Sequence, residues 1–144
     1  MKMKHLKIIT IVLALFVFSF SACKKDDNSS TTNTTSNIIQ QGNWRVTLYN
    51  DNGTDETNLF AGYAFTFNSN GTFLAVKSSS TVNGNWNSGI DDSQNKLFLN
   101  FGTTSPFDEL NDDWHFIEKT TSKMRLEDVS GGNSGTDLLT FEKN

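Results

Sequence analysis

The stretch that decides the fold is YAFTFNSNGTFLAVK, residues 63–77. Its two halves alternate apolar and polar side chains, which is the two-residue period of strands that bury one face. Between the halves stands NSNG, residues 68–71. An Asn-Gly pair is among the strongest hairpin signals, because both residues tolerate positive φ. The stretch therefore predicts two antiparallel strands joined by a tight turn.

The same alternation recurs along most of the chain. Eight six-residue runs have it: 44–49, 63–68, 72–77, 81–86, 96–101, 114–119, 123–128 and 138–143. In the first run Trp44, Val46 and Leu48 fall on one face, with polar residues between them. Turn-forming residues separate the runs. We therefore predict an all-β fold, an eight-stranded antiparallel meander that closes into a small barrel and so leaves no exposed sheet edge.

One short helix is expected between the fifth and sixth strands. Ser105 occupies an N-cap position, Pro106 the first helical position and Asp108 the third. We expect one or two turns that serve as a plain connector, with a lid over a cavity as the alternative.

The first 22 residues have the three parts of a secretory signal. Three lysines come first, an apolar run extends from Ile8 to Phe20, and small residues precede Cys23. The run is shorter than the roughly 20 residues that a helix needs to cross a bilayer. Residues 1–22 are therefore predicted to be a signal peptide that is removed. Of the 12 basic residues, three leave with the signal peptide, so the remaining chain would have nine basic and 16 acidic residues and a net charge of about −7. This negative charge argues against a nucleic-acid partner.

Cys23 is the only cysteine of the sequence and lies where the mature chain would begin. The segment 20–23, Phe-Ser-Ala-Cys, resembles the lipobox of bacterial lipoproteins. This resemblance implies that Cys23 carries acyl chains such as palmitate and anchors the protein to the outer membrane. Several chains anchor stably, whereas one binds only marginally. The KKDD run at 24–27 resembles the surface-export signal of Bacteroidetes-type lipoproteins. A solvated charge run is the alternative, so the cell surface and the periplasmic face both remain open.

After the charge run, the sequence stays polar until Ile38. Such a segment buries too little apolar surface to offset its conformational entropy. We therefore expect residues 23–37 to be a lipidated cysteine with a flexible polar tether. Residues 38–144 are long enough for a single core and form the predicted barrel domain.

The motif Gly42-Asn43-Trp44 resembles the G-x-W motif of the lipocalin and calycin group, and the order of the runs resembles the lipocalin-like domains of Bacteroidetes lipoproteins. The resemblance implies that Trp44 closes one barrel end beneath a basic side chain, for which Arg125 and Lys143 are the candidates. It also implies a small apolar ligand inside the barrel. The aromatic residues that we expect to point inward are Trp44, Phe65, Phe67, Trp86, Trp114 and Phe116. A β-sandwich is the second choice of fold.

Few residues of the predicted mature chain suggest chemistry. Its one histidine, His115, alternates with aromatic residues and should point to the solvent. One histidine and a lipidated cysteine do not make a common zinc site. The segment 51–56, DNGTDE, resembles the opening of a calcium loop, but Gly62 stands where the bidentate glutamate is required, so a polar loop is favoured. We therefore expect no metal, no cofactor and no catalytic residues. An enzyme would need His115 beside a carboxylate in a cleft.

The sequence therefore predicts a monomeric, membrane-anchored, non-enzymatic binding protein. A small apolar ligand in the barrel is the first hypothesis. The alternative is an interaction or structural module with a solid core that contacts a protein or glycan through its loops. An apolar void of a few hundred Å³ at one barrel end would favour the first hypothesis.

Overall fold

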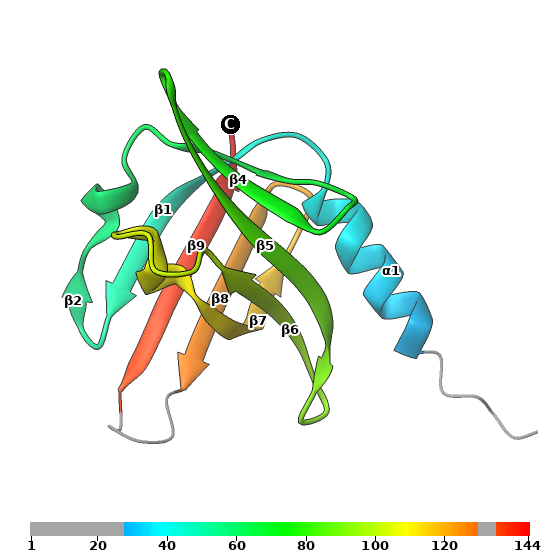
Figure 1. Cartoon of the computed structure of the whole chain (residues 1–144). Coiled ribbons are helices and arrows are strands. Elements are labelled where there is room, and N and C mark those ends of the chain that lie inside the picture. The colour runs from blue at the N-terminus through cyan, green and yellow to red at the C-terminus, as the bar shows by residue number, and fades with distance from the viewer. Residues whose placement is uncertain (1–27, 130–134) are drawn as a thin grey trace, which may run out of the picture.

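The computed structural model describes residues 28–129 and 135–144 (Figure 1). The predicted signal peptide, Cys23 and most of the glycine-rich link at 130–136 lie outside the described residues. The strands are β1 Trp44–Asp51, β2 Thr54–Asp55, β3 Ala64–Phe67, β4 Thr72–Lys77, β5 Ser80–Asp91, β6 Gln94–Asn100, β7 Asp112–Lys119, β8 Lys123–Val129 and β9 Thr136–Lys143. The helices are α1 Asn28–Ile39 and two 3₁₀ helices, η1 Thr57–Phe60 and η2 Phe107–Leu110.

The strands form an antiparallel closed barrel. Their order is β2-β1-β3-β4-β5-β6-β7-β8-β9, and β1 also pairs with β9. The closing contact runs from the pair Trp44 and Lys143 to the pair Asn50 and Leu138. Eight strands thus make the barrel, and the two-residue β2 only extends one end of β1. The predicted eight-stranded barrel is confirmed, and the β-sandwich is excluded.

The hairpin predicted from residues 63–77 is present as β3 and β4. Phe67 pairs with Phe73 at its last register position, and the Asn68 N–H donates to the Thr72 carbonyl at 2.9 Å. Gly71 has a φ of +81°, a conformation that glycine adopts without steric cost. The turn chemistry read from the sequence thus sets the register of both strands.

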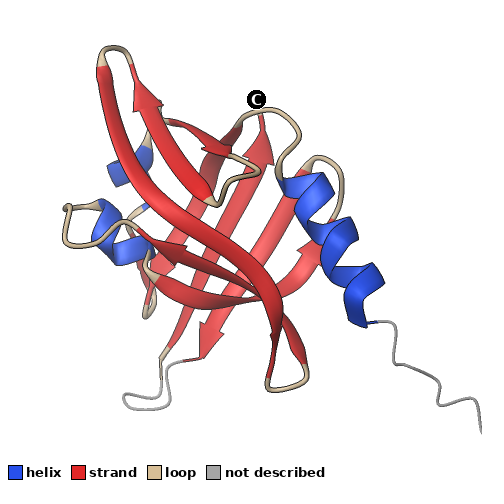
Figure 2. Ribbon diagram, turned by 45° about the vertical axis from the view of Figure 1, so that its right-hand side comes forward, coloured by secondary structure: helices blue, strands red, loops and turns tan. Residues whose placement is uncertain are grey.

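Strand β5 is longer than predicted. It extends through residues 80–91, whereas the sequence pattern indicated only 81–86. Figure 2 shows it as a long curved ribbon that crosses the barrel. Its second half pairs fully with β6, and Asp92 and Ser93 adopt positive φ in the tight turn between the two strands. The extension was missed because Asn87, Ser88 and Gly89 supply no apolar side chain between Trp86 and Ile90.

Two β-bulges change which side chains face the core. In β1 the register shifts between Val46 and Leu48, so Tyr49 is buried and Leu48 only half-buried. The prediction that Leu48 faces the core beside Val46 is therefore wrong. A second shift follows Phe116 in β7 and leaves Ile117 exposed. A bulge inserts one residue and reverses the alternation beyond it.

The predicted connector helix is the 3₁₀ helix η2. It begins at Phe107, one residue later than expected, and Pro106 is its cap residue. Phe107 and Leu110 are buried, and the Leu110 carbonyl accepts the indole N–H of Trp114 at 3.0 Å. The connector thus contributes two apolar side chains to the core.

Helix α1 replaces much of the expected flexible tether. It contacts β5 and lies beside it (Figure 1). Thr35 and Ile39 are buried, the Ser36 and Ser88 hydroxyl oxygens lie 3.0 Å apart, and the Lys119 ammonium donates to the Thr35 hydroxyl. These contacts with the barrel outweigh the low helix propensity of serine, threonine and asparagine. Within the described residues, no helix combines the length and the apolar character needed to cross a membrane.

Candidate functional site

The barrel interior is packed with aromatic rings. Of the six residues proposed to bind a ligand there, five are at most 8 % exposed: Trp44, Phe65, Phe67, Trp86 and Trp114. The Phe67 ring stacks on Phe73 with centroids 4.2 Å apart and meets Trp86 edge-on at 5.4 Å. Phe65 meets Phe141 at 5.5 Å. These residues contact one another where a ligand would have to lie, so they form the core.

The sixth residue, Phe116, is only partly buried and packs at the margin of this core. The Lys119 ammonium lies 5.0 Å from the centroid of its ring. Lys119 in turn donates to Thr35 of helix α1, and burial lowers the pKa of its ammonium. Phe116 therefore borders the place where α1 packs on the barrel.

Trp44 lies at one end of the barrel. Its indole N–H donates to the Ile39 carbonyl at 2.8 Å, and the Lys143 ammonium lies 4.7 Å above its ring. Gly42 has a φ of +75° beneath the Lys143 side chain. Of the two candidates for this basic residue, Lys143 thus has the contact. Arg125 instead lies exposed on β8 with its guanidinium 3.8 Å from Glu118, because its register position turns it to the outer face.

A hollow lies against the β5–β6–β7 part of the sheet. Its volume is about 440 Å³, and we call it the outer groove. The residues that line it are Asn85, Trp86, Asn87, Phe98, Leu99, Asn100, Asn111, Asp112 and Asp113. The register sets Asn87, Phe98 and Asp113 side by side on three neighbouring strands. Asn87 and Phe98 each lie between two buried residues, and Asp113 precedes the buried Trp114, so this row faces outward.

The asparagine side chains of the outer groove are held by the backbone. The Ser88 N–H donates to Asn87 Oδ1 at 2.9 Å, and the Gly102 N–H donates to Asn100 Oδ1 at 2.7 Å. Asn111 bonds through both ends of its amide, to the Phe101 N–H and the Gly102 carbonyl. Asn111 is therefore structural. Asn87 and Asn100 each keep an amide NH₂ for which we find no partner among the described residues.

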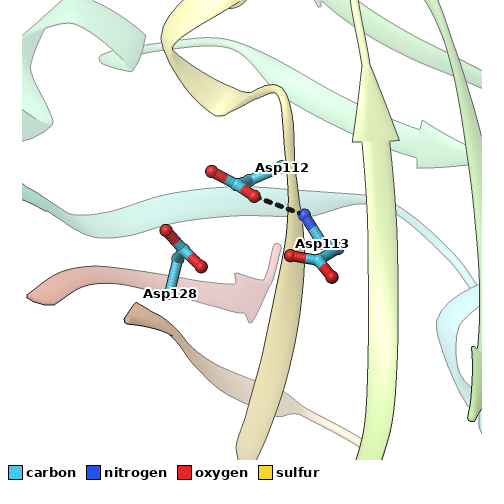
Figure 3. A group of neighbouring side chains, drawn as sticks. All are labelled: Asp112, Asp113 and Asp128. Carbon is cyan, nitrogen blue, oxygen red and sulfur yellow. Dashed lines mark hydrogen bonds between the residues drawn. The ribbon is translucent and has the colours of Figure 1, made fainter. Parts of the chain in front are cut away.

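Three aspartates gather at one end of the groove. Side-chain oxygens of Asp112, Asp113 and Asp128 lie within 4.8 Å of one another. Figure 3 shows Asp112 and Asp128 facing each other, and the Asp113 N–H donates to Asp112 Oδ1 at 2.7 Å. Burial, with a smaller contribution from Asp128, raises the pKa of Asp112. The Lys96 ammonium, 2.6 Å from Asp113 Oδ2, lowers the pKa of Asp113.

Carboxylate oxygens at this spacing are the ligand type that a hard cation takes. Among the described residues, Asp112, Asp113 and Asp128 are the group whose donor atoms lie close enough to share one. Lys96 already supplies a positive charge to Asp113.

At the loop predicted from residues 51–56, Asp55 accepts the Thr57 N–H at 3.0 Å, and hydrogen bonds from Thr57 lower the pKa of Asp55. That carboxylate is used in a turn, as expected for a polar loop.

His115 points outward, as predicted, but has a carboxylate partner. Its Nδ1 lies 3.1 Å from Glu127 Oε1, and both residues line a second hollow of about 290 Å³. The lining residues are Asp92, Gln94, Lys96, Asp113, His115, Glu127, Asp128 and Val129. None of them carries a hydroxyl or thiol. The hollow therefore meets the condition stated for an enzyme, a histidine beside a carboxylate in a cleft, although its lining offers no serine, threonine or cysteine nucleophile.

The sequence held a signal for this contact that was not used. Runs 114–119 and 123–128 are joined by a short turn, so they form a hairpin in which His115 must face an acidic residue. Lys119 pairs with Met124, and Glu118 pairs with Arg125. If the strands were regular, the same register would place His115 opposite Asp128. The bulge after Phe116 shifts the partner to Glu127.

Comparisons with known proteins bear on the fold. No family model matches the chain, and no curated protein matches it. A crystal structure of a DUF4847 family protein from Bacteroides vulgatus ATCC 8482 is similar, with a TM-score of 0.51 and 19 % sequence identity. The match covers 76 % of this chain and 96 % of that one. At this identity the likeness shows that the two proteins share a fold.

Proposed function

We propose that this protein is a non-enzymatic binding module of lipocalin type, held outside the cytoplasm by a lipid anchor on Cys23. We further propose that it binds its partner in the outer groove and not inside the barrel. One contrast carries this proposal: aromatic rings fill the interior, whereas a hollow of about 440 Å³ lies against the β5–β6–β7 sheet. Binding sites are hollows with a few placed polar groups, and the groove has that form.

The assignment to the lipocalin type rests on the order of the strands and on one barrel end. The strands follow one another around the barrel in sequence order. The motif Gly42-Asn43-Trp44 opens the first of them, and Lys143 of the last strand lies over the Trp44 ring. Of the two hypotheses from the sequence, the packed interior favours a solid-core interaction module over an apolar ligand in the barrel.

The groove is tested by mapping where a ligand binds. We would titrate the labelled domain with an extract of the envelope of the cells that make it, and follow backbone amide signals by NMR. We expect shifts in residues 85–87 and 98–100. The substitution Phe98→Ala should weaken them, whereas Ile117→Ala, which also removes an exposed apolar side chain, should not. Shifts confined to interior residues such as Phe65 and Phe141 would refute the groove.

The anchor is tested by metabolic labelling with a fatty acid. Cys23→Ala should abolish both the label and retention in the membrane fraction. Replacement of Asp26 and Asp27 by alanine should keep the label, and protease accessibility on intact cells then reports whether these residues direct surface display. A Cys23→Ala protein that stays membrane-bound would contradict the anchor.

A further inference from the structure

Resting on the function proposed above, we propose that the outer groove binds a neutral carbohydrate. A sugar ring would lie against Phe98, and its hydroxyls would meet the amides of Asn85, Asn87 and Asn100 and the carboxylate of Asp112. The aromatic residue, the hydrogen-bond donors and the charge of the groove each support this class of ligand.

Phe98 supplies the apolar part of the site. It lies on the middle strand of the row, between Asn87 of β5 and Asp113 of β7. Its side chain is half-buried, so part of the ring remains accessible in the groove. An aromatic ring with hydrogen-bonding groups on both sides matches a ligand whose faces carry C–H groups and whose edges carry hydroxyls. A sugar ring has this arrangement.

The amides supply donors that are already oriented. Backbone N–H groups occupy Oδ1 of Asn87 and of Asn100, which fixes each amide plane and leaves its NH₂ as the free end. Asn85 pairs with Asn100 across the two strands and is exposed. Each amide NH₂ has two donor hydrogens, and a hydroxyl both donates and accepts. Side chains that are ordered before binding lose less entropy on binding.

The charges of the groove argue against other classes of ligand. Its lining has no lysine, arginine or histidine, so anions such as phosphates or fatty acids find no counter-charge. An acyl chain would also cover the amides without pairing them, which costs free energy. A peptide that adds a strand needs an open sheet edge, and β6, the middle strand of the groove, is paired with β5 on one side and with β7 on the other. Hydroxyl groups suit both the amides and the carboxyl group of Asp112, because a hydroxyl both donates and accepts.

The test uses a soluble polysaccharide fraction from the envelope of the cells that make the protein, with the backbone amides of the groove as the readout. One portion is oxidised with periodate, which cleaves vicinal diols, and a second is digested with a broad-specificity protease. We expect the untreated and protease-treated portions to shift residues 85–87 and 98–100, and the oxidised portion to lose this effect. Phe98→Ala should weaken binding about tenfold, as loss of an aromatic anchor does, while Phe98→Tyr should retain it and Ile117→Ala should not change it.

Each outcome decides between the two proposals. If protease abolishes the groove shifts and periodate does not, the ligand is a protein: the carbohydrate inference fails, and the outer groove stands. If the polysaccharide fraction causes no shift although the whole extract does, the inference also fails alone. If shifts appear only in the interior, both proposals fail. Thermal unfolding of each variant separates lost binding from lost folding.

Discussion

Gly84 marks a place where two strands approach closely. A Cβ added there would lie 2.7 Å from the Asn100 carbonyl oxygen and 2.7 Å from Cδ1 of Phe101, closer than real contacts allow. On the same strand, a Cβ on Gly89 would meet Cε2 of Phe98 at an ordinary 3.6 Å. We predict that Gly84→Ala lowers the free energy of unfolding by about 1–3 kcal/mol through overpacking. Gly89→Ala should change it little. Urea denaturation measures both, and equal effects would contradict the close approach.

Asp112 and Asp113 should respond oppositely to pH. The folded-state pKa of Asp112 is raised above its ordinary value of 3.8, so its stabilising contribution is present below that value and is lost as the pH rises through the folded pKa. The pKa of Asp113 is lowered, so its contribution is present above 3.8 and is lost as the pH falls through the folded pKa. Ionised Asp112 therefore costs stability at neutral pH, whereas ionised Asp113 contributes to it.

The matched pair Asp112→Asn and Asp113→Asn tests this difference. At pH 7 we expect Asp112→Asn to stabilise the protein by about 0.5 kcal/mol, a small value because solvent screens these charges. Asp113→Asn should destabilise it, because Lys96 loses its partner. Near pH 3 both effects should shrink. Thermal unfolding at the two pH values checks the signs, and two changes in the same direction at pH 7 would be inconsistent with the opposite shifts.

At the scale of the element, helix α1 depends on its contact with the barrel. Ile39 is fully buried and its carbonyl accepts the Trp44 indole N–H, whereas Ile38 is half-buried. We predict that Ile39→Ala costs about 2–4 kcal/mol, the usual range for deleting a buried isoleucine side chain. It should also speed hydrogen exchange in residues 34–39. Ile38→Ala should cost clearly less, and equal losses would show that α1 is not held by Ile39.

The elements differ in how well their sequences predicted them. The hairpin of β3 and β4 was predicted in full, because Asn70-Gly71 sets the turn and alternation sets the faces. The second half of β5 was not, because the residues that follow Trp86 are Asn87, Ser88 and Gly89, of which only the polar Ser88 is buried. Helix α1 was missed because its residues disfavour a helix until it packs on the barrel. Local sequence patterns thus predicted the elements whose own residues alternate between apolar and polar or form a turn motif.

At the scale of the whole molecule, the barrel has a solid core. Phe65 is fully buried among the rings of Phe60, Phe73 and Phe141. We predict that Phe65→Ala costs about 3–5 kcal/mol and leaves an apolar cavity that takes up benzene, detected by NMR shifts of interior residues. Phe98→Ala, the same substitution on the outer face, should cost less and create no such cavity. Interior shifts with benzene in the unmodified protein would contradict a packed core.

The candidate site could be predicted only in part from the sequence. Of the six aromatic residues expected to point inward, all but Phe116 are buried. Their role was set by how tightly the rings pack, which depends on the diameter of the closed barrel. The outer groove was not predicted, because Asn87, Phe98 and Asp113 come together only through the register of three strands. His115 and Glu127 likewise meet through a bulge in β7.

The sequence by itself determined the fold class, the number and order of the barrel strands and most of the faces that they bury. It could do so because hydrophobic alternation and turn residues act within a few positions of one another. The tertiary structure alone decided the two bulges, the docking of α1, the filling of the interior and the residues that line the outer groove. These features depend on contacts between residues far apart in the chain, which no local pattern records.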